Sequence, residues 1–221
     1  MGYSRNLDLI TIDDFKEILV NRYLIPSMRV LLSDIDRRFD LLVQHNIINV
    51  EDLYQQTKTK KKVAHLVEVT GIDIDYMIVL RRLVSSYIAK PRKLNEYPDI
   101  DIVLCKKLEE MNIKTSKILY EYLESEDREQ ILSTLAIDSK QLKCLEALME
   151  VTRLRYVSPL FATVLVRSGY DSIEKIAAGD SKLLHEAILT TNKEQHIYKG
   201  NVGDSDAQFL IDDAVVFMKY R

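Results

Sequence analysis

One stop–start pattern occurs three times along the chain, and it constrains the fold more than any other feature. Each copy holds an apolar residue, a small polar residue two positions later and a large apolar residue six positions later. The copies span residues 47–53, 113–119 and 170–176. An amphipathic pattern precedes each copy, so the chain reads as a helix, a tight turn and a second helix, three times over.

The residues at the turns explain why a helix ends and another begins there. The position before each copy holds Asn46, Asn112 or Gly169. Asn and Gly tolerate the left-handed backbone that commonly ends a helix. The small polar position holds Asn49, Thr115 or Ser172, which are residue types preferred at helix N-caps. The first two copies are followed by a further break, at Gly71-Ile72-Asp73 and at Ala136-Ile137-Asp138.

Composition agrees with a helical chain. Only 6 Gly and 4 Pro occur in 221 residues, whereas sheet proteins usually need more of both for their turns. The formal net charge of −3 is unusual for a strong non-specific nucleic-acid binder. Two cysteines in apolar helical patterns give no disulfide framework, which is typical of a cytoplasmic protein. No apolar run is long enough to span a membrane. We therefore expect an all-α protein that lies in the cytoplasm and does not enter the membrane.

The pattern also predicts how the chain is divided. Residues 1–28 form an N-terminal helical arm, in which Thr11 or Asp13 caps a first helix and a second helix begins near Ser27. Residues 29–95 hold the first pair of units, and residues 96–155 hold the second pair. Residues 156–221 form a third unit with a closing helix from Ala207 to Tyr220.

The order of these segments resembles a family of bacterial proteins of unknown function built from tandem helix-hairpin-helix-like units. The resemblance rests on the lead-in at Asp14-Phe15-Lys16 and residues 23–27, on the run from Thr59 to Ala64, and on the last unit from Phe161 to Lys175. It covers roughly residues 10–190. It implies an all-α fold of tandem helix-hairpin-helix-like (SAM-like) units with an N-terminal helical arm.

The superfamily suggests contact with DNA, because a Gly-x-Gly hairpin lets backbone amides approach a phosphate. The matching hairpin in this chain is Tyr156-Val157-Ser158-Pro159, in which side chains occupy both glycine positions. The hairpins around residues 34–36 and 99–101 carry Asp on both sides of an Ile, and those carboxylates would repel phosphate. The fold is therefore implied more firmly than the function.

A basic stretch between Lys58 and Lys93 is the candidate nucleic-acid site. Its candidate residues are Lys58, Lys60, Lys61, Lys62, Arg81, Arg82, Arg92 and Lys93. Lys90 is a further cation of the stretch, and Arg153 and Arg155 are possible additions to the site. Such a cluster could follow a phosphate backbone. The alternative is a solvated helix start and a polar linker, which is what most charge runs are, and the lack of interleaved aromatic residues favours it.

Residue types that carry chemistry give no active-site pattern. The Asp-Ile-Asp triplets lack the Gly and distal Glu of a calcium loop, so helix capping is the expected role. The four histidines are not spaced as zinc ligands, and Cys105 and Cys144 read as small core residues. No phosphate-binding glycine loop or nucleophile elbow is present. We expect no metal, no cofactor and no catalysis.

Two functions remain open. The first is a non-catalytic interaction module, or scaffold, that binds another protein through helix faces. The second is a DNA-binding protein that uses the basic stretch. The sequence leaves the oligomeric state open.

Overall fold

A computed structural model describes residues 2–221, apart from the side chain of Ile131. Within these residues the regular structure is helical, and pairing between extended segments is limited to isolated bridges. The all-α prediction is confirmed. No helix in the described part of the chain is both long and apolar enough to cross a bilayer.

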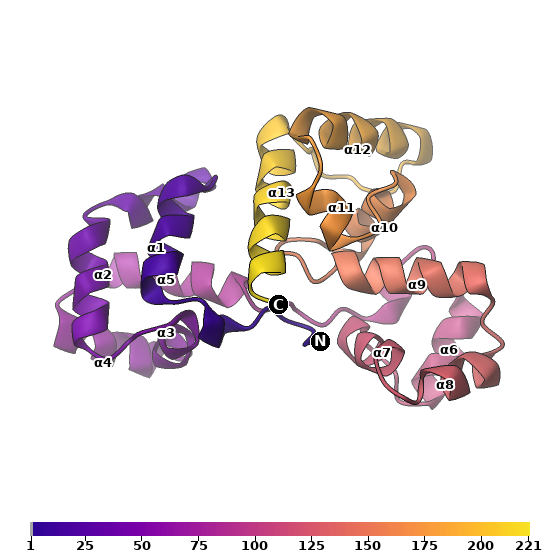
Figure 1. The fold of residues 1–221 in the computed structure, drawn as a ribbon, viewed down its shortest axis with the longest axis horizontal. Coiled ribbons are helices and arrows are strands. Elements are labelled where there is room, and N and C mark those ends of the chain that lie inside the picture. The colour runs from indigo at the N-terminus through magenta and orange to yellow at the C-terminus, as the bar shows by residue number, and fades with distance from the viewer. Residues whose placement is uncertain (1) are drawn as a thin grey trace. The chain divides into compact units, whose positions relative to one another are not determined.

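The described residues divide into two compact units. The first unit holds Arg5–Ile88 with Tyr220, and the second holds Ala89–Lys219 with residues 2–4 and Arg221. The helices of each unit can be followed in Figure 1. Those of the first unit are η1 (Leu7–Leu9), α1 (Ile12–Asn21), η2 (Pro26–Leu32), α2 (Ile35–Gln44), α3 (Val50–Thr57), α4 (Lys60–Thr70) and α5 (Ile74–Ser86).

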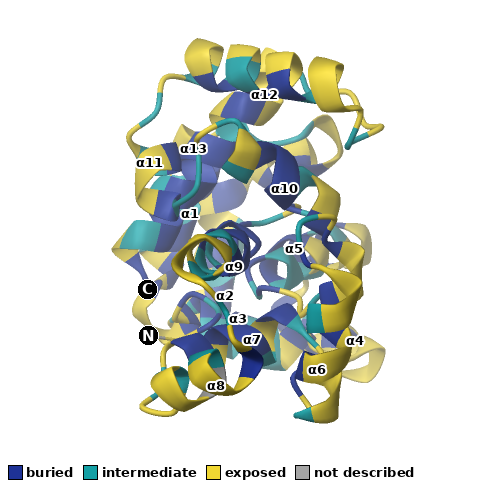
Figure 2. Ribbon diagram, turned by 90° about the vertical axis from the view of Figure 1, so that its right-hand side faces the viewer, coloured by how far each residue is buried: buried dark blue, intermediate teal, exposed yellow. Residues whose placement is uncertain are grey.

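The second unit holds the remaining helices. They are η3 (Leu94–Glu96), α6 (Ile102–Glu110), α7 (Ser116–Leu123), α8 (Arg128–Leu135), α9 (Ser139–Val151), α10 (Pro159–Arg167), α11 (Ile173–Ala177), α12 (Ser181–Gln195) and α13 (Asp204–Lys219). The closing helix α13 packs against α11 and α12 and is buried over most of its length, whereas α8 is largely exposed (Figure 2). α9 packs against both α7 and α10, so it lies at the centre of this unit.

The three predicted turns have the predicted backbone. Asn46, Asn112 and Gly169 take positive φ angles of 60°, 62° and 92° at the ends of α2, α6 and α10. The side chains at the next caps then accept hydrogen bonds from backbone amides at the starts of α3, α7 and α11; these caps are Asn49, Thr115 and Ser172. The residue types at the turns therefore specify both the end of one helix and the start of the next.

The later breaks follow the same logic, with one exception among the Asp triplets. Gly71 and Ala136 end α4 and α8 in left-handed backbone, and Asp73 and Asp101 cap α5 and α6 through their carboxylates. Asp34 does not cap α2. It stands before α2 with a φ of 51°, and its carboxylate accepts a hydrogen bond from Arg37 instead.

Two of these turns are each fixed by an isolated β-bridge to a distant extended residue. The sequence did not predict these bridges. Thr11, the N-cap of α1, bridges to Asn49, the N-cap of α3. In the second unit Lys93 bridges to Thr115, the N-cap of α7. Each bridge supplies backbone partners to a hairpin, so the two hairpins are fixed in the same way within their own units.

The second helix predicted near the end of the N-terminal arm is present, but it is short. It was expected to begin near Ser27, and η2, a 3-10 helix, begins at Pro26 and ends at Leu32. The left-handed backbone of Asp34 separates it from α2, which begins at Ile35.

Candidate functional site

The cations of the basic stretch fall into both units. Lys90, Arg92 and Lys93 belong to the second unit, and the others belong to the first. We use the name basic cluster for the first-unit members: Lys58, Lys60, Lys61, Lys62, Arg81 and Arg82. One contact joins two parts of this cluster, because the Arg81 guanidinium of α5 donates a hydrogen bond to the Lys58 carbonyl over 3.2 Å.

Most of the basic cluster is exposed. Lys60, Lys61 and Lys62 occupy the first turn of α4, where the positive end of the helix dipole makes further positive charge unfavourable. The Lys62 ammonium donates to the Gln55 carbonyl at the end of α3, over 2.7 Å. The cluster is thus a concentration of positive charge contributed by side chains from the α3–α4 turn, α4 and α5.

The backbones of Arg92 and Lys93 bind the segment that begins α7. Lys93 forms the bridge to Thr115, and the Arg92 amide donates to the Ser116 hydroxyl over 2.9 Å. The Ser116 amide in turn donates to the Arg92 carbonyl. These two residues therefore fix the start of α7.

The candidate hairpin, Tyr156-Val157-Ser158-Pro159, precedes α10. Ser158 caps α10 by accepting from the Phe161 amide, and Pro159 stands at the first helical position. Tyr156 has a φ of 63°, so it adopts the left-handed backbone that glycine adopts most readily. The residue is 55% exposed, and its ring packs at a tilt against Phe209 of α13, with ring centroids 5.6 Å apart.

Arg153 and Arg155, the possible additions to a DNA site, point into the protein, so that suggestion is wrong. The Arg153 side chain is 2% exposed and pairs with Glu150. Arg155 pairs with Asp213, which is fully buried, and both its amide and its guanidinium donate to that carboxylate. The backbone amide preceding the hairpin is therefore already bound to an anion of this chain.

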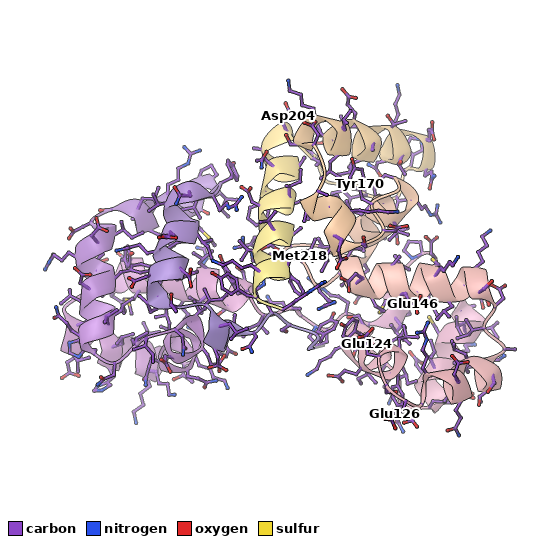
Figure 3. The ribbon with its side chains drawn as sticks, viewed as in Figure 1. Glu124, Glu126, Glu146, Tyr170, Asp204 and Met218 are labelled. Atoms are coloured by element: carbon purple, nitrogen blue, oxygen red, sulfur yellow. The ribbon has the colours of Figure 1, made fainter. Side chains whose placement is uncertain are left out.

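A cleft on the second unit is lined by acidic residues that sequence reasoning missed. It measures about 340 Å³, and we call it the acidic cleft. Its lining residues are Tyr120, Leu123, Glu124, Lys143, Glu146, Ala147, Met149, Glu150, Asp171 and Ser172. Glu146 projects from α9, and Glu124 stands at the end of α7 below it, with Glu126 in the following loop (Figure 3).

The acidic cleft has an apolar floor and a charged rim. Tyr120, Leu123 and Met149 are buried beneath it. Four carboxylates and a single ammonium, that of Lys143, stand among the lining residues. Partners outside the cleft hold some of the acids: Glu146 pairs with Arg128, and Asp171 pairs with Lys175 over 2.7 Å. The rim therefore carries a net negative charge, and ion pairs fix the positions of some of its carboxylates.

Glu150 has the least exposed side chain of the four acids that line the cleft. Burial raises the pKa of its carboxyl, and the nearby Arg153 guanidinium lowers it only in part. The ionised carboxylate is thus incompletely compensated for the water that it has lost. A further cation at the cleft would stabilise its charged form.

A second cavity, of about 470 Å³, lies beside α6 and α9 of the same unit. Its charges are matched locally, because Arg167 binds Asp99 with two nitrogens and also donates to Gln195 over 2.5 Å. Burial raises the pKa of the Cys144 thiol at its wall, which makes the thiol a weaker nucleophile at neutral pH. This cavity offers less unsatisfied charge than the acidic cleft, although it is larger.

Sequence reasoning could not assemble the acidic cleft, because its acids come from α7, α9 and the α10–α11 turn. A chain with 34 Asp and Glu residues offers too many acid pairs to choose from. Within residues 2–221 no group of His, Cys, Asp or Glu side chains has the arrangement of a metal site.

Comparison with known proteins places these elements in one family. No curated protein matches the chain, and no solved structure matches it. A family model described as "Domain of unknown function (DUF4332)" matches residues 99–215, which is more than half of the chain. The match runs from the residues before α6 into α13, so it includes the acidic cleft and the hairpin before α10. The chain belongs to this family, the DUF4332 domain family.

Proposed function

We propose that the protein is a non-catalytic interaction module whose second unit binds a basic and apolar segment of a partner protein. The observation that carries this proposal is the acidic cleft, where four carboxylates surround a floor of buried Tyr120, Leu123 and Met149. A segment with Lys or Arg beside aliphatic side chains complements both features.

The electrostatics favour such a partner. Charged residues around a partly desolvated cleft contribute to specificity and to the rate of association. An incoming ammonium or guanidinium would also stabilise the ionised Glu150, whose pKa is raised by burial. A nucleic-acid backbone would meet the carboxylates of Glu124 and Glu146 and be repelled.

We further infer that α2–α3, α6–α7 and α10–α11 are helix-hairpin-helix-like units that form the scaffold. The support is the shared turn geometry: left-handed backbone at the end of one helix, then a side-chain cap on the next. In such a scaffold the turns hold short helices at fixed angles, and the grooves between helices are free to bind. The acidic cleft is one such groove.

Fluorescence polarisation with a labelled peptide of alternating Lys and Leu residues tests the proposal. The native protein should bind it saturably, and the affinity should fall as salt rises. Removing charge with Glu124→Gln, Glu146→Gln and Asp171→Asn should weaken binding at least about tenfold at low salt. The matched control removes exposed acids of the same unit: Glu109→Gln, Glu110→Gln and Glu194→Gln. Equal loss in both triple variants would refute a specific role for the acidic cleft.

A second candidate function is DNA binding by the first unit. It is favoured by the basic cluster, in which side chains from the α3–α4 turn, α4 and α5 concentrate positive charge. Contact with phosphates would relieve the repulsion between the lysines in the first turn of α4. The hairpin before α10 is a poorer candidate for binding phosphate, because the Arg155 amide already donates its hydrogen bond to the Asp213 carboxylate.

A salt series with labelled duplex and single-stranded DNA tests this candidate. If the basic cluster binds DNA, replacing Lys60, Lys61 and Lys62 with Glu should abolish binding or flatten its salt dependence. Reversing the charge of Lys106, Lys107 and Lys182, which are exposed on the second unit, is the matched control. Unchanged binding in the first triple variant would remove the basic cluster from consideration.

A further inference from the structure

A slot in the second unit holds a short stretch of chain from far away in the sequence. Residues 2–4 belong to this unit, while the chain from Arg5 onward belongs to the first. The Tyr3 side chain enters the slot and is only 4% exposed. Its ring meets Tyr120 edge-on, with centroids 5.6 Å apart, and its hydroxyl lies 2.7 Å from the Ser116 hydroxyl.

A buried cation recognises the main chain of this stretch. Arg153 donates from Nε to the Tyr3 carbonyl over 3.0 Å and from Nη2 to the Gly2 carbonyl over 3.1 Å. Its guanidinium also lies over the rings of Tyr120 and Phe217, 4.4 Å and 4.6 Å from their centroids. Residues of α7, α9 and α13, namely Tyr120, Glu150 and Phe217, therefore hold the Arg153 side chain in the position from which it binds the carbonyls.

The remaining contacts complete a three-residue recognition site. The Ser4 hydroxyl accepts from the Ala89 amide over 3.2 Å. Ser116 is held in place by the Arg92 amide, so the hydroxyl that meets Tyr3 is positioned independently of the occupant. The residues that make these contacts all lie in the continuous stretch Ala89–Lys219.

We propose that this slot is a peptide-binding site for a Gly-Tyr-Ser-like segment, and that residues 2–4 are its resident occupant. The pocket around the Tyr3 side chain supplies side-chain specificity, and Arg153 binds the main-chain carbonyls. A tethered occupant has a high effective concentration, so a segment from another chain binds only when the resident one is displaced or weakened. The site is distinct from the acidic cleft, although Tyr120 is a wall of both and Glu150 pairs with Arg153.

Displacing the resident segment tests the proposal. Two variants are used. Tyr3→Gly removes the side chain from the slot, and a second variant lacks residues 1–4 but is otherwise unchanged. A Gly-Tyr-Ser peptide labelled at its C-terminal end should bind both variants saturably, and should bind the native protein at least about tenfold more weakly.

Changes in the peptide give a control that leaves the protein intact. Replacing its Tyr with Ala should weaken binding at least about tenfold, and replacing it with Phe should have a smaller effect, because only the bond to Ser116 is lost. Equal binding of the Tyr and Ala peptides, or no binding to a folded variant, overturns the proposal. If a variant does not fold by itself, the Tyr peptide but not the Ala peptide should restore its helical circular dichroism. Failure to restore it overturns the proposal as well.

Discussion

Arg155 and Asp213 form an ion pair, 2.5 Å from Nε to Oδ1, in which the carboxylate is fully buried. The Arg155 amide donates to the same carboxylate over 2.8 Å. The pair joins the hairpin before α10 to the closing helix α13. Within the second unit this pair therefore uses an arginine side chain and a backbone amide for packing.

Removing the carboxylate should destabilise the second unit strongly. Asp213→Ala removes the buried carboxylate that pairs with the Arg155 guanidinium, and breaking such a pair typically costs about 3–5 kcal/mol. Urea unfolding followed by circular dichroism measures the change. Glu194→Gln, an exposed change on α12, should shift the midpoint very little. A midpoint for Asp213→Ala close to that of the native protein would contradict the structural role of the pair.

The turn residues should respond to substitution according to their backbone. Gly169 has a φ of 92°, and a Cβ there would meet no atom within 4 Å, so Gly169→Ala tests backbone strain alone. We expect it to lower the free energy of unfolding by about 1–2 kcal/mol. Asn112→Gly, at the equivalent turn with a φ of 62°, should be neutral or stabilising because Gly relieves the strain. Similar destabilisation by both changes would show that the left-handed backbone at these turns does not determine the effect of a substitution on stability.

The capping residues should each contribute to stability. Thr115→Ala removes the side-chain acceptor for the Ile118 amide at the start of α7, which should cost about 1 kcal/mol. Thr115→Ser keeps a hydroxyl and should retain most of that stability. Thermal unfolding of the two variants compares them directly, and equal melting temperatures would exclude the cap as the cause.

Glu150 should make stability depend on pH in a defined direction. Burial raises the pKa of its carboxyl above the usual 4.5, and the charges of Arg153, Arg221 and Glu174 act on it as well. The folded state therefore binds the proton more tightly than the unfolded state. This contribution to stability is present below pH 4.5 and is lost as the pH rises through the raised pKa.

Glu150→Gln should reduce that pH dependence, because the amide does not titrate. Urea unfolding from pH 4.5 to neutrality measures the slope for the native protein and for the variant. Glu194→Gln, a change at an exposed acid, should keep the native slope. An unchanged slope in Glu150→Gln would show that another group titrates in this range.

The sequence predicted those parts of the fold that are encoded locally. Asn46, Asn112 and Gly169 are visible as helix ends because few residue types accept their backbone conformation. Asp34 was misread because its left-handed conformation depends on the surrounding structure rather than on its residue type. Only distant contacts bring Tyr3 to Ser116 and Arg153, so nothing near Tyr3 in the sequence predicts its burial.

The acidic cleft was missed for a related reason. Glu124, Glu146 and Asp171 lie on separate elements, and each has an unremarkable helical context of its own. The basic stretch was visible because its lysines are adjacent in sequence, but the units divide it at Ile88. Adjacency in sequence therefore suggested one site whose residues belong to two units. Separation in sequence concealed the acidic cleft, whose residues belong to one unit.

The most direct test of the interaction proposal is a nuclear magnetic resonance titration of the isotope-labelled protein with the peptide of alternating Lys and Leu residues. The account predicts that amide shifts concentrate in the segments 120–124, 143–150 and 171–172, which contain the residues that line the acidic cleft. Saturating peptide that leaves these amides unperturbed, or that perturbs only the first unit, would contradict it.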